Sequence, residues 1–374
     1  MNPPTISSLI ALAHAQALKA SGITAPNPAV GCVIVGADGQ LLGQGHTQPV
    51  GGPHAEIMAM RDAAARGHSV AGSTAYVTLE PCSHHGRTGP CCDALIAAGI
   101  ARVVASLADP NPLVAGNGFA RLRAAGVEVE VGPGAAQARE LNIGFFSRMV
   151  RKAPWVRMKI AASLDCKTAL ADGSSQWITS PPARQDGHAW RARASAVLTG
   201  IGTVLEDDPL LDVRLVETTR QPHLVIVDSR LQTPLGAKLF TGGRTIWIYT
   251  AVDDAEKAAA LTARGATVIR MAGNTPQTSA KVDLAAMLGD LGRREINELH
   301  VEAGHKLNGS LLREGLVDEL LVYLAPKLIG QGLDMANLGP LAALGDAVPL
   351  EFHQIELLPP DLRILARIPG RDRF

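Results

Sequence analysis

The residues with the clearest chemical potential lie in two stretches of the first hundred residues. The stretch PHAEI (53–57) contains His54 and Glu56, and LEPCSHHGRTGPCC (79–92) contains three of the five cysteines in the chain. Such a cysteine group could form a disulfide loop, a metal site or a reactive thiol. An odd and sparse set of cysteines fits a disulfide framework poorly, so the sequence favours a metal site.

One histidine and two cysteines match the ligand set of a catalytic zinc ion, which keeps its fourth position open for water. His54 falls at the start of a predicted helix, Cys82 just after a predicted strand, and Cys91 at the start of the next predicted helix. A helix N-terminus favours the thiolate form of cysteine. We therefore predict that His54, Cys82 and Cys91 bind zinc, which lowers the pKa of bound water to roughly 7. Glu56 is the predicted catalytic proton carrier.

The order His-x-Glu, then Pro-Cys and a further Cys, is the signature of zinc nucleobase deaminases. Their usual spacing is Cys-x-x-Cys, whereas here the insert SHHGRTGP (83–90) separates Cys82 from Cys91. The insert carries two histidines and an arginine, so it is cationic. We expect Cys32 and Cys92 to be core thiols, because cysteine is among the residue types that are most often buried.

The elements that position these residues alternate between helix and strand. In the first part we predict helices over 5–21, 54–67, 91–99, 118–126 and 135–150, and strands over 29–35, 41–45, 73–80, 102–107 and 127–131. In the second part we predict strands over 155–162, 196–200, 223–227, 245–249, 267–270, 298–301 and 320–324, helices over 181–192, 255–264, 284–292 and 307–314, and two final strands joined by PPD (359–361). The alternation indicates α/β layers. The basic stretch RMVRKAP (148–154) marks the predicted boundary between domains 1–150 and 151–374.

A second candidate site lies in VEAGHKLNGSLL (301–312). Glu302 ends a predicted strand, Gly304 turns the chain, and a helix begins near His305. Such a junction presents backbone N–H groups to a pyrophosphate. The stretch TGIGTV (199–204) lacks the third glycine of the dinucleotide fingerprint, so a Rossmann site is not predicted.

Composition limits the classes of partner. The chain has 374 residues, which suggests two or three domains, and its 35 Lys plus Arg equal its 35 Asp plus Glu. Zero net charge argues against a broad nucleic-acid or membrane surface, and no run approaches the ~18 apolar residues of a membrane span. The first residues lack the pattern of a signal peptide. We expect a cytoplasmic protein with small-molecule partners; the oligomeric state stays open, a homodimer being one option.

Several motifs together resemble the bifunctional riboflavin-biosynthesis deaminase–reductase. They are PNPAVGCVIV (26–35), GGPHAE (51–56), VTLEPCSHHGRTGPCCDALI (77–96), DPNPLVAGNG (109–118), KIAASLDCKTA (159–169), LTGIGTVLEDDPLLDVR (198–214) and VEAGHKLNGSLL. The resemblance implies a cytidine-deaminase-like three-layer α/β domain followed by a dihydrofolate-reductase-like domain. It implies zinc-dependent deamination of 2,5-diamino-6-(5-phosphoribosylamino)pyrimidin-4-one. NADPH would then reduce the ribosyl group of 5-amino-6-(5-phosphoribosylamino)uracil to ribityl.

The same resemblance assigns further residues. The deaminase substrate would contact Asn27, His46, His84 and Arg87. NADPH would contact Ala161, Trp177, Thr203, Asp207, Ser229, Gly304, His305, Lys306, Leu307, Asn308, Gly309 and Ser310. The reductase substrate would contact Ser175, Arg191, Leu211, Arg214 and Glu302. Lys159 and Asp207 would be catalytic, Lys159 steadying the opened ribose and Asp207 assisting proton transfer.

Two positions depart from the family pattern, and three rival functions stay open. Cys166 stands where the family usually has glycine, so it is strained if the position needs a positive φ; Ala303 also replaces a frequent glycine. The rivals are a zinc deaminase of tRNA adenosine or free nucleotides, a closed zinc scaffold with four protein ligands, and a second domain that is only structural. Neutral charge speaks against tRNA, which needs a basic surface.

Overall fold

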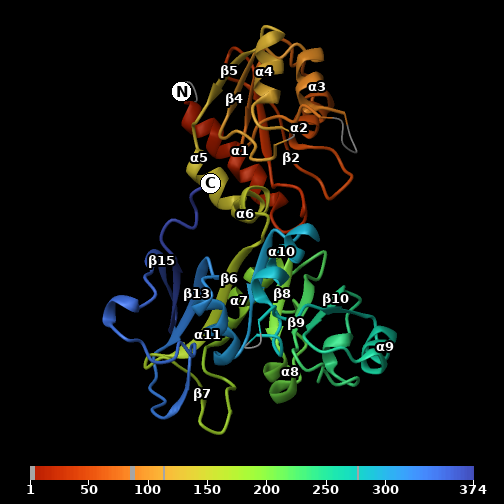
Figure 1. The fold of residues 1–374 in the computed structure, drawn as a ribbon. Helices are drawn as coiled ribbons and strands as arrows, with labels where there is room; N and C mark the ends of the chain where they lie inside the picture. Colours follow the sequence, from red (N-terminus) through yellow and green to blue (C-terminus); the bar gives the residue numbers. More distant parts are fainter. Residues whose placement is uncertain (1–4, 85–88, 113, 276–277) are drawn as a thin grey trace. The chain divides into compact units, whose positions relative to one another are not determined.

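The computed structural model describes residues 5–84, 89–112, 114–275 and 278–374. The chain divides into two compact units, Met1–Arg151 and Lys152–Phe374 (Figure 1). Among the helices that the structure describes, none has both the length and the hydropathy needed to cross a bilayer.

The first unit is built on a five-stranded sheet of order β2-β1-β3-β4-β5. Its elements are α1 (Ile6–Ala20), β1 (Gly31–Val35), β2 (Leu41–His46), α2 (Ala55–Ala65), β3 (Thr74–Val77), α3 (Cys91–Ala97), β4 (Arg102–Ala105), α4 (Asn117–Ala124), β5 (Glu128–Val131), α5 (Ala135–Leu141) and α6 (Ile143–Arg151). Strand β1 is antiparallel to β2 and β3, whereas β3, β4 and β5 are parallel.

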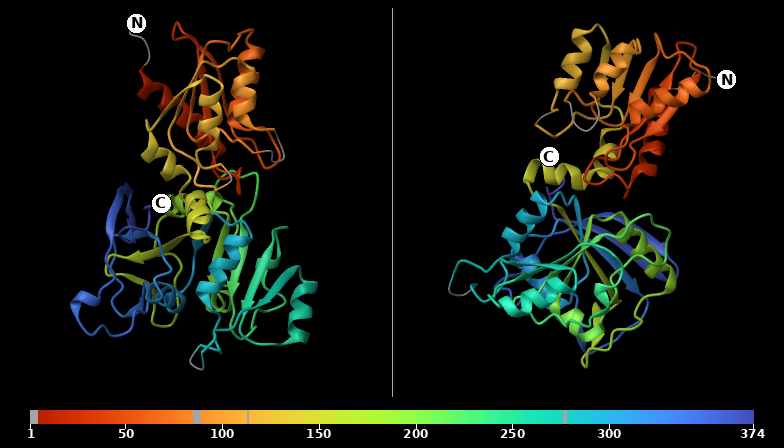
Figure 2. Two further views of the ribbon diagram at one scale, coloured as in Figure 1. Left: turned by 45° about the horizontal axis from the view of Figure 1, so that its top comes forward. Right: turned by 90° about the vertical axis from the view of Figure 1, so that its right-hand side faces the viewer.

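Glycines let two helices approach opposite faces of this sheet. A β-carbon on Gly31 would lie 1.9 Å from the backbone oxygen of Ala13 in α1, and one on Gly43 would lie 2.2 Å from that of Ala59 in α2. Gly43 pairs with Ile34 in the sheet, so Gly31 and Gly43 project to different faces. Helices therefore cover both faces (Figure 2), and the predicted three-layer architecture is confirmed.

The single helix predicted over 135–150 is two helices, α5 and α6. Asn142 separates them with a φ of −111°. Its side chain accepts the N–H of Ala29 at 2.7 Å and donates to the oxygen of Ala29 at 2.9 Å. A pairing with backbone 113 residues away thus interrupts a stretch whose local sequence favours a continuous helix.

The second unit has a nine-stranded sheet of order β11-β10-β9-β8-β12-β6-β13-β16-β15 and a two-stranded sheet of β7 and β14. Its strands are β6 (Trp155–Ser163), β7 (Lys167–Leu170), β8 (Ala196–Gly200), β9 (His223–Val227), β10 (Ile246–Thr250), β11 (Ala266–Arg270), β12 (Glu298–Val301), β13 (Glu319–Ala325), β14 (Gly332–Asp334), β15 (Glu351–Leu358) and β16 (Asp361–Arg367). Its helices are α7 (Pro181–Arg193), α8 (Ile201–Asp207), α9 (Ala255–Ala263), α10 (Leu284–Arg293) and α11 (His305–Arg313), with short 3₁₀ turns at Lys238–Phe240 and Leu344–Asp346.

All neighbouring strands from β11 to β13 are parallel, and β16 runs antiparallel to both of its neighbours, β13 and β15. The central strands β8, β12 and β6 are almost entirely buried, as expected for a parallel sheet covered on both faces. The carboxyl ends of these strands lie together at one edge of the sheet, where α/β proteins place their ligands.

Candidate active sites

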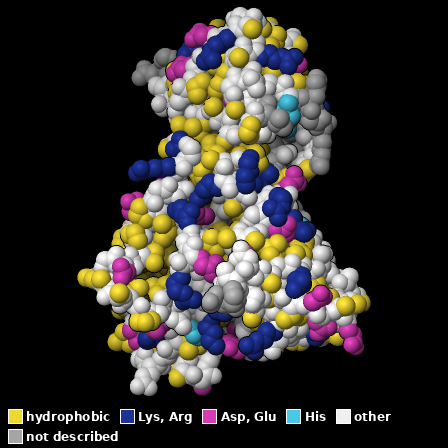
Figure 3. Space-filling view, viewed as in Figure 1, with side chains coloured by type: hydrophobic (Ala, Val, Ile, Leu, Met, Phe, Trp, Pro, Cys, Tyr) yellow, Lys and Arg dark blue, Asp and Glu magenta, His cyan; other side chains and the backbone are white. Residues whose placement is uncertain are grey.

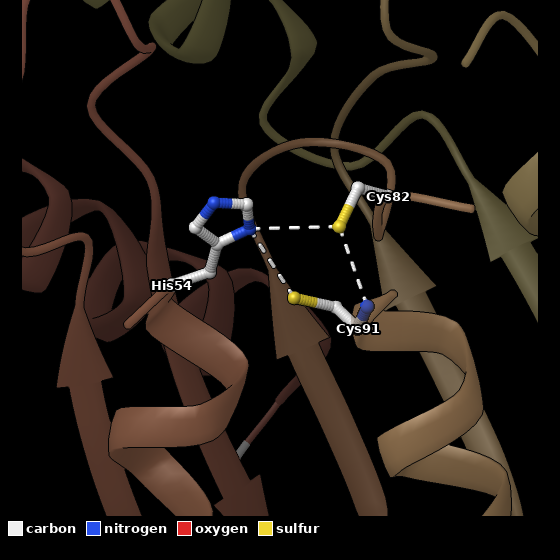
Figure 4. Close-up of side chains that lie close together, drawn as sticks. All are labelled: His54, Cys82 and Cys91. Carbon is white, nitrogen blue, oxygen red and sulfur yellow. Dashed lines mark hydrogen bonds between the residues drawn. The ribbon is translucent and has the colours of Figure 1, made fainter. Parts of the chain in front are cut away.

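Three side chains of the first unit converge as the sequence predicts for a metal site (Figure 4). Nδ1 of His54 lies 3.5 Å from Sγ of Cys82 and 3.3 Å from Sγ of Cys91, and the three ligand atoms all lie within 4.8 Å of one another. His54 caps the start of α2, Cys82 follows β3, and Cys91 opens α3. One nitrogen and two sulfurs at this separation suit tetrahedral zinc, and three protein ligands leave a position for water.

The electrostatics of the group favour an ionised thiol beside a buried acid. Hydrogen bonding from the Cys91 thiol, together with His54 and the Cys91 backbone N–H at 3.3 Å, lowers the pKa of the Cys82 thiol to about 4. Burial, followed by the negative charge of Cys82, raises the pKa of Glu56 to about 7. The charge of His54, followed by smaller contributions that include the Cys91 side chain, partly opposes this rise, so Glu56 and the ligand group influence one another.

A second buried glutamate fixes the chain next to Cys82. The Glu80 carboxylate accepts backbone N–H bonds from Asp109 at 3.1 Å, Gly116 at 2.9 Å, Gly118 at 2.9 Å and Phe119 at 3.2 Å. One acidic side chain therefore holds the loop that precedes α4 and the first turn of that helix. Glu80 has no recognisable signal in the local sequence, because its four partners lie about 30 to 40 residues further along the chain.

Of the four predicted substrate residues of the first unit, the structure describes three. Asn27 and His46 are half-buried, and burial, followed by the charge of Lys19, lowers the pKa of His46. His84 is half-buried, and its Nδ1 has no hydrogen-bond partner among the described residues. Arg87 lies outside the described residues. Cys32 and Cys92 are buried, as predicted for core thiols.

Asp109 is a further buried carboxylate that the sequence analysis did not single out. It accepts the N–H of Asn111 at 2.8 Å, and burial raises its pKa to about 7, with the charges of Glu80 and Cys82 adding to the effect. Its signal in the sequence is the motif DPNPLVAGNG, which was used only for the family resemblance.

The second unit contains a cavity of about 860 Å³ at the carboxyl ends of its parallel strands. The predicted residues that line it are Lys159, Ala161, Ser175, Trp177, Arg191, Thr203, Asp207, Leu211, Arg214, Glu302, Gly304, His305, Lys306, Leu307 and Asn308. Ser229, Gly309 and Ser310 are not among the described residues that line this cavity.

Local contacts account for those three placements. The Ser229 hydroxyl accepts the N–H of Val282 at 3.1 Å. A β-carbon on Gly309 would lie 1.9 Å from the backbone oxygen of Asn337, so this glycine permits close packing there. The Ser310 hydroxyl donates to the oxygen of Lys306 within α11. As cofactor contacts these residues stay predictions.

A network of ion pairs joins three of the residues that line the cavity. Arg191 binds the Glu302 carboxylate with two hydrogen bonds of 2.7 and 2.9 Å, and Nζ of Lys159 lies 3.7 Å from the same carboxylate. Burial opposes ionisation of Glu302, but Arg191 and Lys159 outweigh it and hold the pKa of Glu302 well below its usual range. Asp207 is exposed, and partial desolvation, with Glu206, raises its pKa.

Gly304 is the N-cap of α11, as the sequence predicts, and the residues of the first turn of that helix line the cavity. Trp177 is 62% exposed at the cavity, and the guanidinium of Arg184 lies 4.5 Å from the centre of its ring. The sequence does not indicate a role for Arg184, because a cation–π contact between a loop tryptophan and an arginine in the first turn of α7 has no local sequence signal.

Comparison with known proteins assigns a family to each part of the chain. Residues 4–107 match the family described as the cytidine and deoxycytidylate deaminase zinc-binding region, and residues 154–364 match the RibD C-terminal domain. The riboflavin biosynthesis protein RibD of Escherichia coli is 46% identical over 91% of this chain and 93% of that protein. RibD of Aquifex aeolicus is 42% identical over 94% of this chain and 96% of that protein.

Solved structures extend the likeness to the fold. RibD of Acinetobacter baumannii superposes with a TM-score of 0.86 at 38% identity, covering 97% of this chain and 98% of that one. A Thermotoga maritima protein, described as a diaminohydroxyphosphoribosylaminopyrimidine deaminase/5-amino-6-(5-phosphoribosylamino)uracil reductase, has a TM-score of 0.86 at 33% identity with the same coverage.

The fold and the two sites define a bifunctional enzyme, in which a zinc-type deaminase precedes a reductase of the dihydrofolate-reductase-like class. The chain belongs to the RibD family of riboflavin biosynthesis proteins.

Proposed function

We propose that the first unit deaminates 2,5-diamino-6-(5-phosphoribosylamino)pyrimidin-4-one. We also propose that the second unit reduces the ribosyl group of 5-amino-6-(5-phosphoribosylamino)uracil with NADPH. The observation that carries the first activity is the convergence of His54, Cys82 and Cys91 beside the buried Glu56. The Thermotoga maritima relative, which is described by both activities, supports this choice of substrates.

In the deaminase, His54, Cys82 and Cys91 would hold zinc, which when bound supplies a hydroxide at neutral pH. Glu56 takes one proton of the attacking water and passes it to a ring nitrogen. It then takes the second proton, from the hydroxyl of the tetrahedral intermediate, and passes it to the departing amine, so that ammonia leaves. We assign Asn27, His46, His84 and Arg87 to the pyrimidine and the ribose phosphate. The cationic insert supports this assignment, because histidine and arginine donate charge-assisted hydrogen bonds to phosphate.

Replacement of Glu56 by alanine tests this mechanism in the full chain. The variant is expected to bind about one zinc per chain and to release no ammonia from the diaminopyrimidine phosphate. Glu128→Ala, which removes a carboxylate that is 69% exposed on β5, is the matched control and should retain the activity. Full activity of Glu56→Ala would contradict the proposed proton transfer. If both Glu56→Ala and the control Glu128→Ala bound zinc but released no ammonia, a structural zinc scaffold would be favoured.

In the reductase, the cavity offers a place for each part of NADPH and substrate. The first N–H groups of α11, after Gly304, suit the cofactor pyrophosphate. NADPH, when bound, supplies the hydride. Arg191 and Glu302 orient the opened ribose, Lys159 steadies it, and Asp207 assists the accompanying proton transfer. The network that joins Arg191, Glu302 and Lys159 supports these roles, because it fixes their charged groups before substrate binds.

The sheet edge formed by β15 supports a homodimer. Phe352, Ile355 and Leu357 are 71%, 55% and 65% exposed on this terminal strand, and apolar side chains gather at its place in Figure 3. An unpaired apolar edge strand is a ready site for a second chain. Light scattering of the wild type and of Phe352→Lys tests this: a wild-type dimer that the substitution dissociates supports it, and a wild-type monomer contradicts it.

We place the protein in the cytoplasm. None of the five cysteines is in a disulfide, and sparse cysteines without disulfides are typical of a reducing compartment.

A further inference from the structure

The wall of the reductase cavity includes an irregular segment, Leu210–Arg214, whose conformation is not one the chain adopts by itself. Leu210, Leu211 and Arg214 line the cavity, and no helix or strand includes them. Leu211 has a φ of +51°, which residues other than glycine disfavour. A strained, irregular segment persists only where surrounding groups hold it.

Side chains from outside this segment bind its backbone. The Gln221 amide accepts the N–H of Val213 at 2.7 Å and donates to the oxygen of Val213 at 2.9 Å. Nδ1 of the buried His188, on α7, accepts the N–H of Arg214 at 3.2 Å. The ring of His188 must therefore be neutral at Nδ1 to make this bond.

Two guanidinium groups bind the remaining carbonyls. Arg244 donates to the oxygens of both Leu210 and Leu211, and Arg191 donates to the oxygen of Asp212. Four consecutive carbonyl groups, from Leu210 to Val213, thus accept hydrogen bonds from side chains. The segment in turn fixes the guanidinium of Arg214, which lies 2.5 Å from the Asp212 carboxylate at the cavity wall.

We infer that Gln221, His188 and Arg244 are positioning residues of the reductase. None of the three is among the described residues that line the cavity. They hold Leu210–Arg214 so that Arg214 presents its guanidinium to the phosphate of the substrate, a group that arginine binds with directed hydrogen bonds. The inference rests on the proposed reductase function of this cavity. Because the backbone is fixed before binding, the substrate does not have to order it.

The role predicts a selective change in the Michaelis constant. Gln221→Leu removes both bonds to Val213 and is expected to raise the KM for the phosphorylated aminouracil about five- to tenfold. The KM for NADPH and kcat should stay within about twofold, because the proposed pyrophosphate site after Gly304 does not involve this segment. Gln185→Leu, on the exposed side of α7, is the matched control and should leave all three constants unchanged.

A pair of histidine variants supplies the second test. His188→Asn keeps an oxygen that can accept the Arg214 N–H and is expected to retain the wild-type KM. His188→Leu should raise it as Gln221→Leu does. A purely structural loss would lower the amount of active enzyme and thus kcat, without a selective rise in one KM.

Unchanged KM for the aminouracil in both Gln221→Leu and His188→Leu would overturn the inference, as would an equal rise in KM for NADPH. Absence of NADPH oxidation by the wild-type enzyme with this substrate is a different result, and it would overturn the proposed function itself.

Discussion

Replacement of Glu80 by glutamine is expected to weaken the first unit strongly, although the two side chains have nearly the same size. The buried carboxylate accepts four backbone N–H groups, those of Asp109, Gly116, Gly118 and Phe119. Each carboxylate oxygen accepts two of them. The –NH₂ group of glutamine cannot accept, so whichever way the amide is oriented, two of the four donors lose their acceptor.

The magnitude follows from these two donors. A buried donor left without a partner costs about 1–3 kcal/mol, so Glu80→Gln should lower the local free energy of unfolding by about 2–6 kcal/mol. A loss of about 2 kcal/mol, the lower end of this range, already corresponds to a roughly 30-fold faster exchange of the amide hydrogens. Hydrogen exchange of the four named amides in the zinc-loaded full chain measures it directly.

The control is Glu128→Gln, which changes an exposed carboxylate that lies 3.2 Å from Arg102. An exposed ion pair is worth about 0–1 kcal/mol, so little change is expected. If Glu80→Gln accelerated exchange no more than Glu128→Gln does, the four hydrogen bonds would not carry the stability that we assign to them.

Two further predictions concern the second unit. Cys166 is exposed and has a φ of +64°, so Cys166→Gly should stabilise the protein by about 0.5–1 kcal/mol in urea titrations. Cys166→Ala, which keeps the β-carbon, should not stabilise the protein. Equal changes in the free energy of unfolding for the two variants would contradict backbone strain at this position. Burial, with Arg191 and Arg214, lowers the pKa of His188 from 6.5 to about 4. At a pH between these two pKa values, His188 binds a proton in the unfolded chain but not in the folded one. The stability contributed by neutral His188 is therefore complete above pH 6.5 and is lost as the pH falls toward 4. Wild type should lose more stability than His188→Asn over this interval, and equal losses would contradict the assignment.

Much of the fold could be predicted because its signals are local. Buried runs such as Ala196–Gly200 and His223–Val227 are apolar, short and bounded by turns, and the structure has them as β8 and β9. Helix α8 was not predicted, because Gly200 and Gly202 flank its first residue and it ends in an acidic stretch that is typical of a loop. The short strands β7 and β14 were also missed, since they pair only with each other across about 165 residues.

The family resemblance marks Cys166 as a replacement of a usual glycine, which is strained if φ is positive, and the structure shows that φ is positive there. The zinc-ligand candidates were recognisable because each sits at the end of a predicted element. The residues that hold Leu210–Arg214 were not recognisable. Gln221, His188 and Arg244 meet that segment from separate parts of the chain, and nothing in their local sequence indicates the contact.

The central claim is that one chain carries two independent chemistries, of which only the first depends on zinc. The most direct measurement follows ammonia release and the loss of NADPH absorbance in the same sample, before and after zinc is removed by a chelator. With the diaminopyrimidine phosphate, chelation should abolish both signals, because the reductase receives no substrate. With the aminouracil phosphate supplied directly, NADPH oxidation should continue at an unchanged rate. Ammonia release that persists after zinc is removed would contradict the account. Reduction of the supplied aminouracil that stops when zinc is removed would contradict it as well.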